Sequence, residues 1–225
     1  MRTNAQKLLV ALTVALFAFS GCKKEKITAE SPFVATEHFI GGTITPKNGS
    51  YTSVFLIKLL ADNKAVFMSS GKDFAGDYVL SKDSLIVTVS DPNNYRVAKF
   101  AINQKHELTS AYYKALTLEY NATGELITIG DKNQLAGKRF KGEEFKMGGT
   151  SYRKDLVYKF AASGTTFGAD VEANADDKAN TYELINNNAF RFKDGARVEF
   201  GFASNKKLTV FRLSGLYYYG KYDQQ

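Results

Sequence analysis

The sequence has little cysteine, histidine or proline and contains no tryptophan: one Cys, two His and three Pro among 225 residues. A single cysteine excludes an internal disulfide, so the folded chain must be stabilised by packing and hydrogen bonds alone. Zinc sites use three or four His, Cys or carboxylate ligands, and neither histidine has a second histidine or cysteine at ligand spacing. All three prolines precede residue 93, so no proline interrupts a strand in the later part of the chain.

The chain also lacks a concentrated basic region. Its formal net charge is +7, with 30 Lys and Arg against 23 Asp and Glu. Removing residues 1–21, which contain Arg2 and Lys7, leaves 28 basic against 23 acidic residues, or +5. Part of this charge lies at Lys23, Lys24 and Lys26, and no basic helix or recognition motif follows. The composition therefore excludes a nucleic-acid footprint.

The first 22 residues read as a targeting segment. Arg2 and Lys7 precede a run without charge, residues 8–19. A helix of about a dozen residues is too short to cross a bilayer, which needs roughly 20. The run is therefore typical of the apolar region of a signal peptide. It ends in Phe19-Ser20-Gly21-Cys22, with small residues directly before the chain's cysteine.

These four residues closely resemble the lipobox of bacterial lipoproteins. The resemblance implies that residues 1–21 are removed and that Cys22 becomes acylated, with palmitate among its acyl chains. More than one acyl chain gives stable membrane attachment. Lys23 follows the cysteine, whereas an Asp there would imply inner-membrane retention in Gram-negative lipoproteins, so the resemblance implies the outer membrane. The alternative is an ordinary signal peptide with an incidental thiol.

The mature chain is predicted to comprise a lipidated flexible tether, residues 22–37, and two β-domains, residues 38–130 and 131–225. The tether is charged, rich in small residues and contains Pro32. From about residue 39 onward apolar and polar residues alternate, which predicts an all-β fold of short antiparallel strands. In the first half the predicted strands are residues 42–45, 54–60, 65–69, 78–80, 85–89, 97–102, 108–112 and 116–120, followed by a turn at 121–124 and a strand at 125–129.

The second half of the chain repeats the first at an offset of about 100 residues. Phe55 and Ile57 correspond to Leu156 and Tyr158, and similar matches occur at Phe100 and Phe200. Residues 173–180 form the expected loop insertion. Each unit of about eight strands is long enough to form a small barrel. The pattern resembles the lipocalin-like domains of bacterial lipoproteins, without the Gly-x-Trp signature of true lipocalins, and an open β-sandwich is the alternative.

No catalytic, metal or cofactor site is predicted. His38 lies at the end of the tether and His106 in a polar turn, so both are expected at the solvated surface. The adjacent pairs Glu143-Glu144 and Asp176-Asp177 are the carboxylates a glycosidase would use, but both are expected in solvent-facing loops. A calcium site remains the alternative for the acidic residues Asp170, Glu172, Asp176 and Asp177, although no Asp-x-Asp-x-Asp-Gly loop is present.

The tyrosines are the candidate ligand-binding residues. If Tyr218 points into the core, then Tyr217 and Tyr219 point outward, and Tyr112 and Tyr113 hold the related place in the first unit. Exposed tyrosines can stack on a sugar or anchor a protein interface. Six phenylalanines are expected to fill the second barrel and exclude lipid-sized ligands: Phe160, Phe167, Phe190, Phe192, Phe200 and Phe202.

The favoured function is a non-enzymatic envelope lipoprotein that acts as a binding or structural module. The alternatives are a component of an uptake system that binds a small apolar molecule or a glycan, and an envelope hydrolase. The expected partners are the membrane, through Cys22, and an envelope protein, glycan or small apolar ligand.

Overall fold

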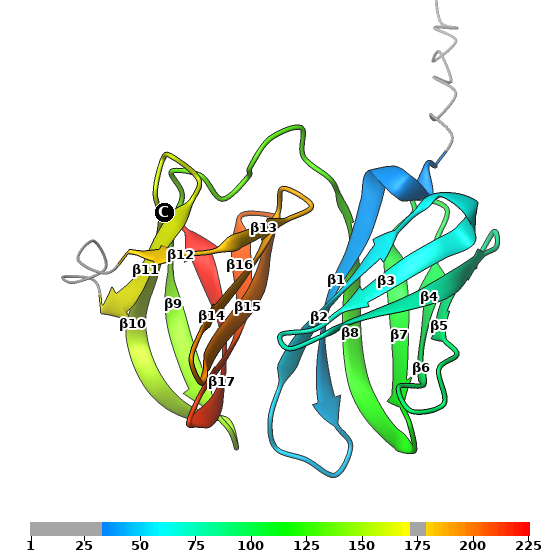
Figure 1. Ribbon diagram of the computed structural model, residues 1–225, viewed down its shortest axis with the longest axis horizontal. Coiled ribbons are helices and arrows are strands. Elements are labelled where there is room, and N and C mark those ends of the chain that lie inside the picture. Colours follow the sequence, from blue (N-terminus) through cyan, green and yellow to red (C-terminus); the bar gives the residue numbers. More distant parts are fainter. Residues whose placement is uncertain (1–32, 172–178) are drawn as a thin grey trace, which may run out of the picture. The chain divides into compact units, whose positions relative to one another are not determined.

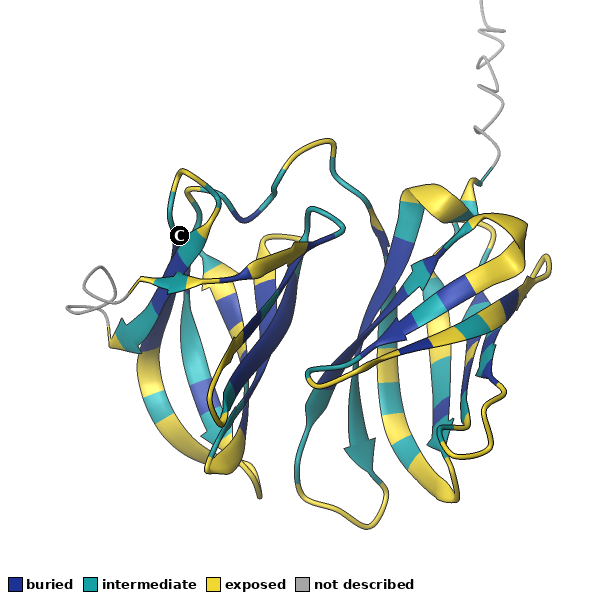
Figure 2. Cartoon of the chain, in the orientation of Figure 1, coloured by how far each residue is buried: buried dark blue, intermediate teal, exposed yellow. Residues whose placement is uncertain are grey.

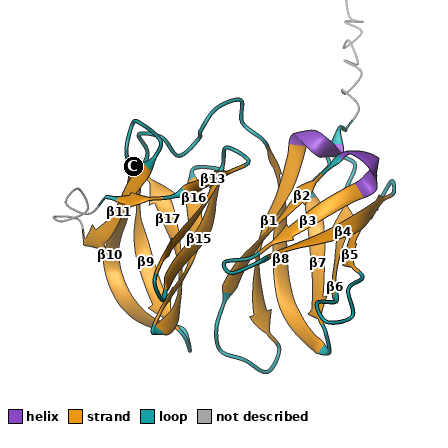
Figure 3. Cartoon of the chain, in the orientation of Figure 1, coloured by secondary structure: helices purple, strands orange, loops and turns teal. Residues whose placement is uncertain are grey.

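The computed structural model describes residues 33–171 and 179–225. The predicted signal peptide, Cys22 and tether residues 22–32 lie outside this range. Val34–Gln225 forms one compact unit that is almost entirely β-structure, with two short 3-10 helices, η1 (Ala35–Glu37) and η2 (Ala61–Asn63). Figure 3 shows these two turns as the helical segments among strands. None of the described helices has the length and hydropathy needed to span a bilayer.

The first eight strands close into an antiparallel barrel (Figure 1). Each strand pairs with the next along the chain, and β1 pairs with β8 to complete the closure. The eight strands are β1 (His38–Pro46), β2 (Ser53–Leu59), β3 (Lys64–Met68), β4 (Asp73–Leu80), β5 (Ser84–Val89), β6 (Arg96–Ile102), β7 (Leu108–Ala115) and β8 (Leu118–Thr128).

Apolar side chains fill the interior of this barrel. Successive residues of a strand point to opposite faces, so the alternating pattern places one set of side chains inside. Phe55, Phe67 and Tyr113 pack against one another there, with ring centroids 5.3 to 5.8 Å apart. Ala35 of η1 also packs against this core, so the last residues of the predicted tether belong to the folded unit. The alternation of buried and exposed positions is visible along the strands in Figure 2.

The predicted turn at residues 121–124 is wrong, because β8 continues through it from Leu118 to Thr128. The reason is that residues 120–128 of β8 pair with β1, and the hydroxyls of Thr43 and Thr123 are 2.7 Å apart in this pairing. The chain turns earlier, at Leu116, which has a positive φ of 52°. A sequence rich in Asn, Thr and Gly thus forms a strand because a partner strand satisfies its backbone groups.

The second half forms a nine-stranded antiparallel sheet with the order β12-β11-β10-β9-β17-β16-β15-β14-β13. Its two edge strands, β12 and β13, are consecutive in sequence and are separated by Tyr182 alone. The sheet is therefore barrel-like, with one strand interrupted. The strands are β9 (Arg139–Lys146), β10 (Thr150–Phe160), β11 (Thr166–Val171), β12 (Asn180–Thr181), β13 (Glu183–Ile185), β14 (Ala189–Asp194), β15 (Arg197–Ser204), β16 (Lys207–Ser214) and β17 (Leu216–Gln224).

The two sheets correspond strand by strand, which confirms the predicted pair of tandem β-units. β9 pairs with β17 as β1 pairs with β8, and β12 with β13 take the place of β4. Gly42 and Gly142 occupy equivalent positions at this closure. A Cβ on Gly42 would lie 2.2 Å from the carbonyl oxygen of Thr123, and one on Gly142 would lie 2.4 Å from that of Lys221. Glycine at both positions lets the first and last strands of each unit approach.

Both faces of β14, β15 and β16 are buried, which corrects the prediction that six phenylalanines fill the second barrel. Phe160, Phe167, Phe190 and Phe192 do lie inside it. Phe200 and Phe202 instead point outward and pack in a separate cluster with side chains of the first sheet, among them Phe39 and Leu56 of β1 and β2. The alternating pattern could not reveal this, since a strand buried on both faces is apolar at successive positions.

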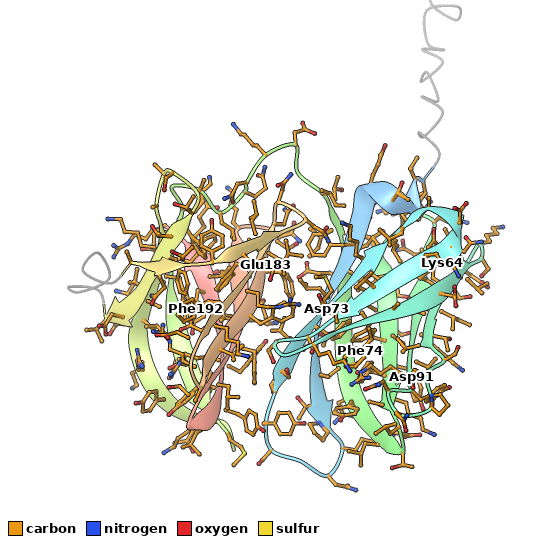
Figure 4. All side chains as sticks on the ribbon, viewed as in Figure 1. Lys64, Asp73, Phe74, Asp91, Glu183 and Phe192 are labelled. Carbon is orange, nitrogen blue, oxygen red and sulfur yellow. The ribbon has the colours of Figure 1, made fainter. Side chains whose placement is uncertain are left out.

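Ion pairs of Arg191 lie beside the apolar cluster that Phe200 and Phe202 share with the first sheet. Arg191 on β14 donates to the carboxylates of Asp73 on β4 and Glu183 on β13. Figure 4 labels Asp73 and Glu183. The guanidinium of Arg191 also lies over the ring of Phe200, 5.3 Å from its centroid. The linker of residues 129–138 also contacts the second sheet's loop between β13 and β14, because the backbone N–H of Gln134 donates to the carbonyl oxygen of Asn187.

Candidate functional site: a polar cavity in the second sheet

The interior of the second sheet changes from aromatic to charged along its length. At the end where the linker enters, Phe140, Phe160, Phe167 and Phe190 pack together with centroid separations of 5.2 to 6.1 Å. The opposite end is formed by the hairpins β9–β10, β14–β15 and β16–β17. There the inward positions are occupied by Glu, Arg and Tyr side chains.

Arg212 and Glu144 form the most buried ion pair of this end. Nε and Nη2 of Arg212 each donate to one carboxylate oxygen of Glu144, both at 2.7 Å. Glu144 is 1% and Arg212 7% exposed. The two residues lie on β9 and β16 with β17 between them, where Gly220 pairs with Glu144 and presents no side chain. The guanidinium of Arg212 also lies over the Tyr218 ring, 3.8 Å from its centroid.

Glu199 forms the centre of a second buried group. Its Oε2 accepts a 2.8 Å hydrogen bond from the Tyr158 hydroxyl, and its Oε1 accepts a 2.8 Å bond from Nε of Arg197. Nη2 of Arg197 donates to the same oxygen. Glu199 is 0% exposed, so both oxygens are satisfied within the protein. The Arg197 guanidinium lies 5.0 Å from the centroid of Phe192, a residue labelled in Figure 4.

Burial and charge shift the pKa values of this cluster. Burial, followed by the negative charge of Glu199, raises the pKa of Tyr158 well above its usual value. Burial and the charge of Glu144 do the same for Tyr222. Burial by itself would lower the pKa of Arg212, but its hydrogen bonds to Glu144 and the charge of that carboxylate raise it. Both phenols thus stay neutral, and Arg212 stays charged.

These side chains line a cavity of about 310 Å³, at the lower end of the range of roughly 300 to 1,000 Å³ for ligand pockets. Its wall is mainly polar and includes three arginines, Arg153, Arg197 and Arg212. The acidic residues on the described part of the wall are Asp170 and Glu199. The remaining lining residues are Tyr152, Leu156, Tyr158, Ala169 and Ser214.

The first barrel explains why the second one is hollow at this point. The strand registers make Phe55, Phe67 and Tyr113 equivalent to Leu156, Ala169 and Arg212. The aromatic stack that fills the first barrel is therefore replaced by one leucine, one alanine and one arginine, which leave space unfilled.

The same comparison locates the buried carboxylates. By register, Glu144 and Glu199 occupy the positions held in the first barrel by Ile44 and Ala98. Ala98 belongs to the apolar core of the first barrel, and Ile44 packs against it. This fold therefore does not need charge at these positions. Burying ion pairs costs desolvation energy, so their presence in one unit alone marks the cavity as a candidate functional site.

Tyr217 and Tyr219 do lie on the face opposite Tyr218, but that face is largely covered. Tyr219 packs against the apolar cluster between the sheets, and burial raises its pKa to about 12. Tyr217 is 37% exposed and stacks on Tyr51, with ring centroids 4.7 Å apart. Both tyrosines border a smaller cavity of about 140 Å³, together with Ser50 and Met147.

Tyr112 and Tyr113 lie on β7 and are not brought together with Tyr217 and Tyr219. Tyr113 is buried in the first barrel, and burial raises its pKa to about 12. Tyr112 points to the outside, where its hydroxyl donates to Glu119 at 3.2 Å. The four predicted tyrosines therefore do not form one surface.

The expected solvent-facing loop at Glu143-Glu144 is wrong. Both residues lie in β9, and Glu144 points into the cavity end of the sheet, where Arg212 satisfies it. Asp176 and Asp177 lie outside the described residues, as does Glu172 of the alternative calcium site. Within residues 33–171 and 179–225, no group of three His, Cys, Asp or Glu side chains could hold a metal ion.

The two histidines belong to the first unit. Nδ1 of His38 lies 3.0 Å from the carbonyl oxygen of Val34. His106 occupies a turn with a positive φ of 59°.

The predicted match of Phe100 with Phe200 is wrong by register, since Ala98 corresponds to Glu199 and Phe100 therefore to Gly201. At an offset of 100 the sequence aligns Glu199 with Lys99 and Arg212 with Tyr112, so the repeat did not reveal this site.

Comparison of the chain with protein-family models, curated proteins and solved structures found no match.

Proposed function

We propose that this chain is a lipid-anchored protein of the bacterial cell envelope that binds a small polar ligand without transforming it. The anchor is Cys22 of the lipobox-like segment, and the outer membrane is the proposed location because Lys23 follows it. In this proposal the filled first barrel is a structural unit and the second sheet carries the ligand site.

The observation that carries the proposal is the polar cavity lined by Arg153, Arg197 and Arg212. Its residues are fixed before any ligand arrives, because Glu144 holds Arg212 and Glu199 holds Arg197. Side chains held in place lose little conformational entropy on binding, which favours affinity.

Binding is favoured over hydrolysis by the state of the two buried carboxylates. A glycosidase needs one protonated carboxyl group and one free carboxylate facing the substrate. Glu144 and Glu199 each accept hydrogen bonds from an arginine and are almost fully buried. Neither described histidine lies on the cavity wall, so no general base of that type is at hand.

The proposal is tested by measuring the thermal stability of the protein against a panel of small polar molecules. The panel contains neutral sugars, amino acids, dicarboxylates and inorganic phosphate. A ligand that binds the folded state raises the melting temperature in proportion to the logarithm of its concentration. We expect at least one class to raise it, and Ala169→Phe to abolish the shift by filling the cavity. Absence of a shift across the whole panel would contradict the proposal.

A further inference from the structure

We infer that the cavity of the second sheet binds a neutral sugar, of one or two rings, rather than an ion or an amino acid. This inference rests on the proposed binding function and specifies its ligand. It follows from the charge balance, the remaining hydrogen-bonding groups and the shape of the cavity.

Among the residues that the structure describes, the charges around the cavity cancel. Arg153, Arg197 and Arg212 stand against Asp170, Glu199 and the buried Glu144, which lies behind Arg212. An anion would meet the carboxylates of Asp170 and Glu199, and a cation would meet three guanidinium groups. Neither sign of charge gains a net attraction, and both lose hydration on entering. A neutral ligand avoids this cost.

The ion pairs already present also disfavour a zwitterion. The carboxylate of an amino acid would have to compete with Glu144 for Arg212, and its ammonium group with Arg197 for Glu199. Glu199 is 0% exposed and has both oxygens occupied. Breaking either pair would leave a buried charge without its partner, which is strongly unfavourable.

A polyhydroxylated ligand can bind through the hydrogen-bonding groups that the two ion pairs do not use. Among the contacts of the described residues, Arg212 and Arg197 each use Nε and Nη2, and Nη1 makes no hydrogen bond. These Nη1 donors suit the oxygen of a sugar hydroxyl. The hydroxyl of Ser214 on the same wall both donates and accepts. Sugar hydroxyls likewise donate and accept, so they can satisfy this mixed lining.

The rim supplies an aromatic surface. Tyr152 lines the cavity, is 49% exposed and lies beside Arg153, whose guanidinium is 5.2 Å from its ring centroid. An exposed tyrosine ring can stack on the apolar face of a sugar. The sequence pointed to tyrosines as sugar-stacking residues, and the structure assigns this role to Tyr152 rather than to Tyr217 or Tyr219.

The inference is tested by isothermal titration of the full chain, held in a detergent without a sugar head group. The probes are D-glucose, D-galactose, N-acetyl-D-glucosamine and cellobiose, with L-glutamate, L-arginine and inorganic phosphate as competing classes. We expect saturable binding of at least one sugar at a stoichiometry of one, and no binding of the charged probes.

Three variants separate the cavity from the rest of the surface. Tyr152→Ala removes an exposed ring and should weaken sugar binding at least tenfold. Ala169→Phe restores the aromatic residue found at the equivalent Phe67 position and should abolish binding, whereas Ala169→Ser, which keeps the cavity open, should retain it. Tyr112→Ala on the first barrel is the matched control and should leave affinity unchanged. Circular dichroism establishes that each variant is folded.

The outcomes distinguish this inference from the proposed function on which it rests. Binding of glutamate, arginine or phosphate without any sugar, lost in Ala169→Phe, would overturn the sugar assignment and leave a polar-ligand site. Sugar binding that survives Ala169→Phe but is lost in Tyr112→Ala would place the site elsewhere and overturn the inference. Absence of binding by every probe would count against both.

Discussion

Arg212 and Glu144 are joined by two parallel 2.7 Å hydrogen bonds although they lie on strands that do not pair, β16 and β9. On the intervening β17, Gly220 pairs with Glu144 and Tyr218 pairs with Arg212. Such bidentate pairs are geometrically specific, and when buried they are costly to break. This pair fixes the guanidinium that lines the cavity, so it links the stability of the second sheet to its proposed function.

Removing one partner should destabilise the protein far more than replacing both. Arg212→Met leaves the buried Glu144 carboxylate without its main partner and should lower the free energy of unfolding by about 3 to 5 kcal/mol. The double variant Glu144→Leu with Arg212→Met should unfold with a free energy near or above that of the original chain. Urea denaturation followed by circular dichroism measures both.

The exposed pair Lys47–Glu119, with side chains 52% and 42% accessible, is the control for this experiment. Lys47→Met should change the free energy of unfolding by no more than about 1 kcal/mol. A double variant at positions 144 and 212 that is as unstable as Arg212→Met would show that the pair is needed for packing and not only for charge balance.

The protein should lose stability as the pH rises above 10. The pKa of Tyr113 and that of Tyr219 are both about 12 in the folded state, against 10.0 for the unperturbed phenol, because burial disfavours the phenolate. Between these values the unfolded state has released its protons while the folded state still holds them. Stability therefore falls through this interval.

Phenolate absorbance and thermal melting, recorded from pH 9 to 12, measure the effect. Tyr113→Phe removes one of the buried phenols and should make the decline in melting temperature between pH 10 and 12 less steep. A wild-type titration in which every tyrosine ionises near pH 10 with the fold intact would contradict the burial of these rings.

The sequence predicts that residues of about 135 to 225 fold alone. The structure shows that this fragment would then have an uncovered apolar face. In isolation, this fragment would expose the apolar side chains Phe200, Phe202 and Phe211, which pack in the cluster shared with the first sheet. We expect a cooperative thermal transition at a lower temperature than that of the whole chain, together with self-association through the uncovered face.

Differential scanning calorimetry and sedimentation velocity test this expectation. Adding the separate fragment of residues 33–130 should raise the transition temperature and suppress self-association, because this fragment covers the apolar face of the 135–225 fragment. A monomeric fragment as stable as the whole chain would show that the shared cluster contributes little.

Cys22→Ala should release the protein from membranes. The chain has no other cysteine, so no second thiol can carry the acyl chains. Membrane fractionation with a high-salt wash distinguishes an acyl anchor from electrostatic attachment through Lys23, Lys24 and Lys26. A Cys22→Ala protein that still sediments with membranes after the wash would contradict the lipobox interpretation, and Ser20→Ala serves as a control that retains the thiol.

The amino-acid sequence by itself determined the all-β class, most strand positions and the tandem repeat. These properties are local or periodic: alternation defines the strands, turn residues separate them, and matched spacings such as Phe55 with Leu156 reveal the duplication. Residues 121–124 show the limit of local rules, because pairing with β1 converts an apparent turn into the middle of β8.

Only the tertiary structure decided which faces of each strand are buried and which part of the protein covers each face. Alternation separates two faces but does not say that both faces of β15 are covered, so Phe200 and Phe202 could not be told from the interior phenylalanines. It also could not show that Glu144, next to another glutamate in sequence, meets Arg212 from a strand 68 residues away. A charged side chain can be buried at low cost only where a partner of opposite charge lies beside it, and that partner comes close only when the chain folds.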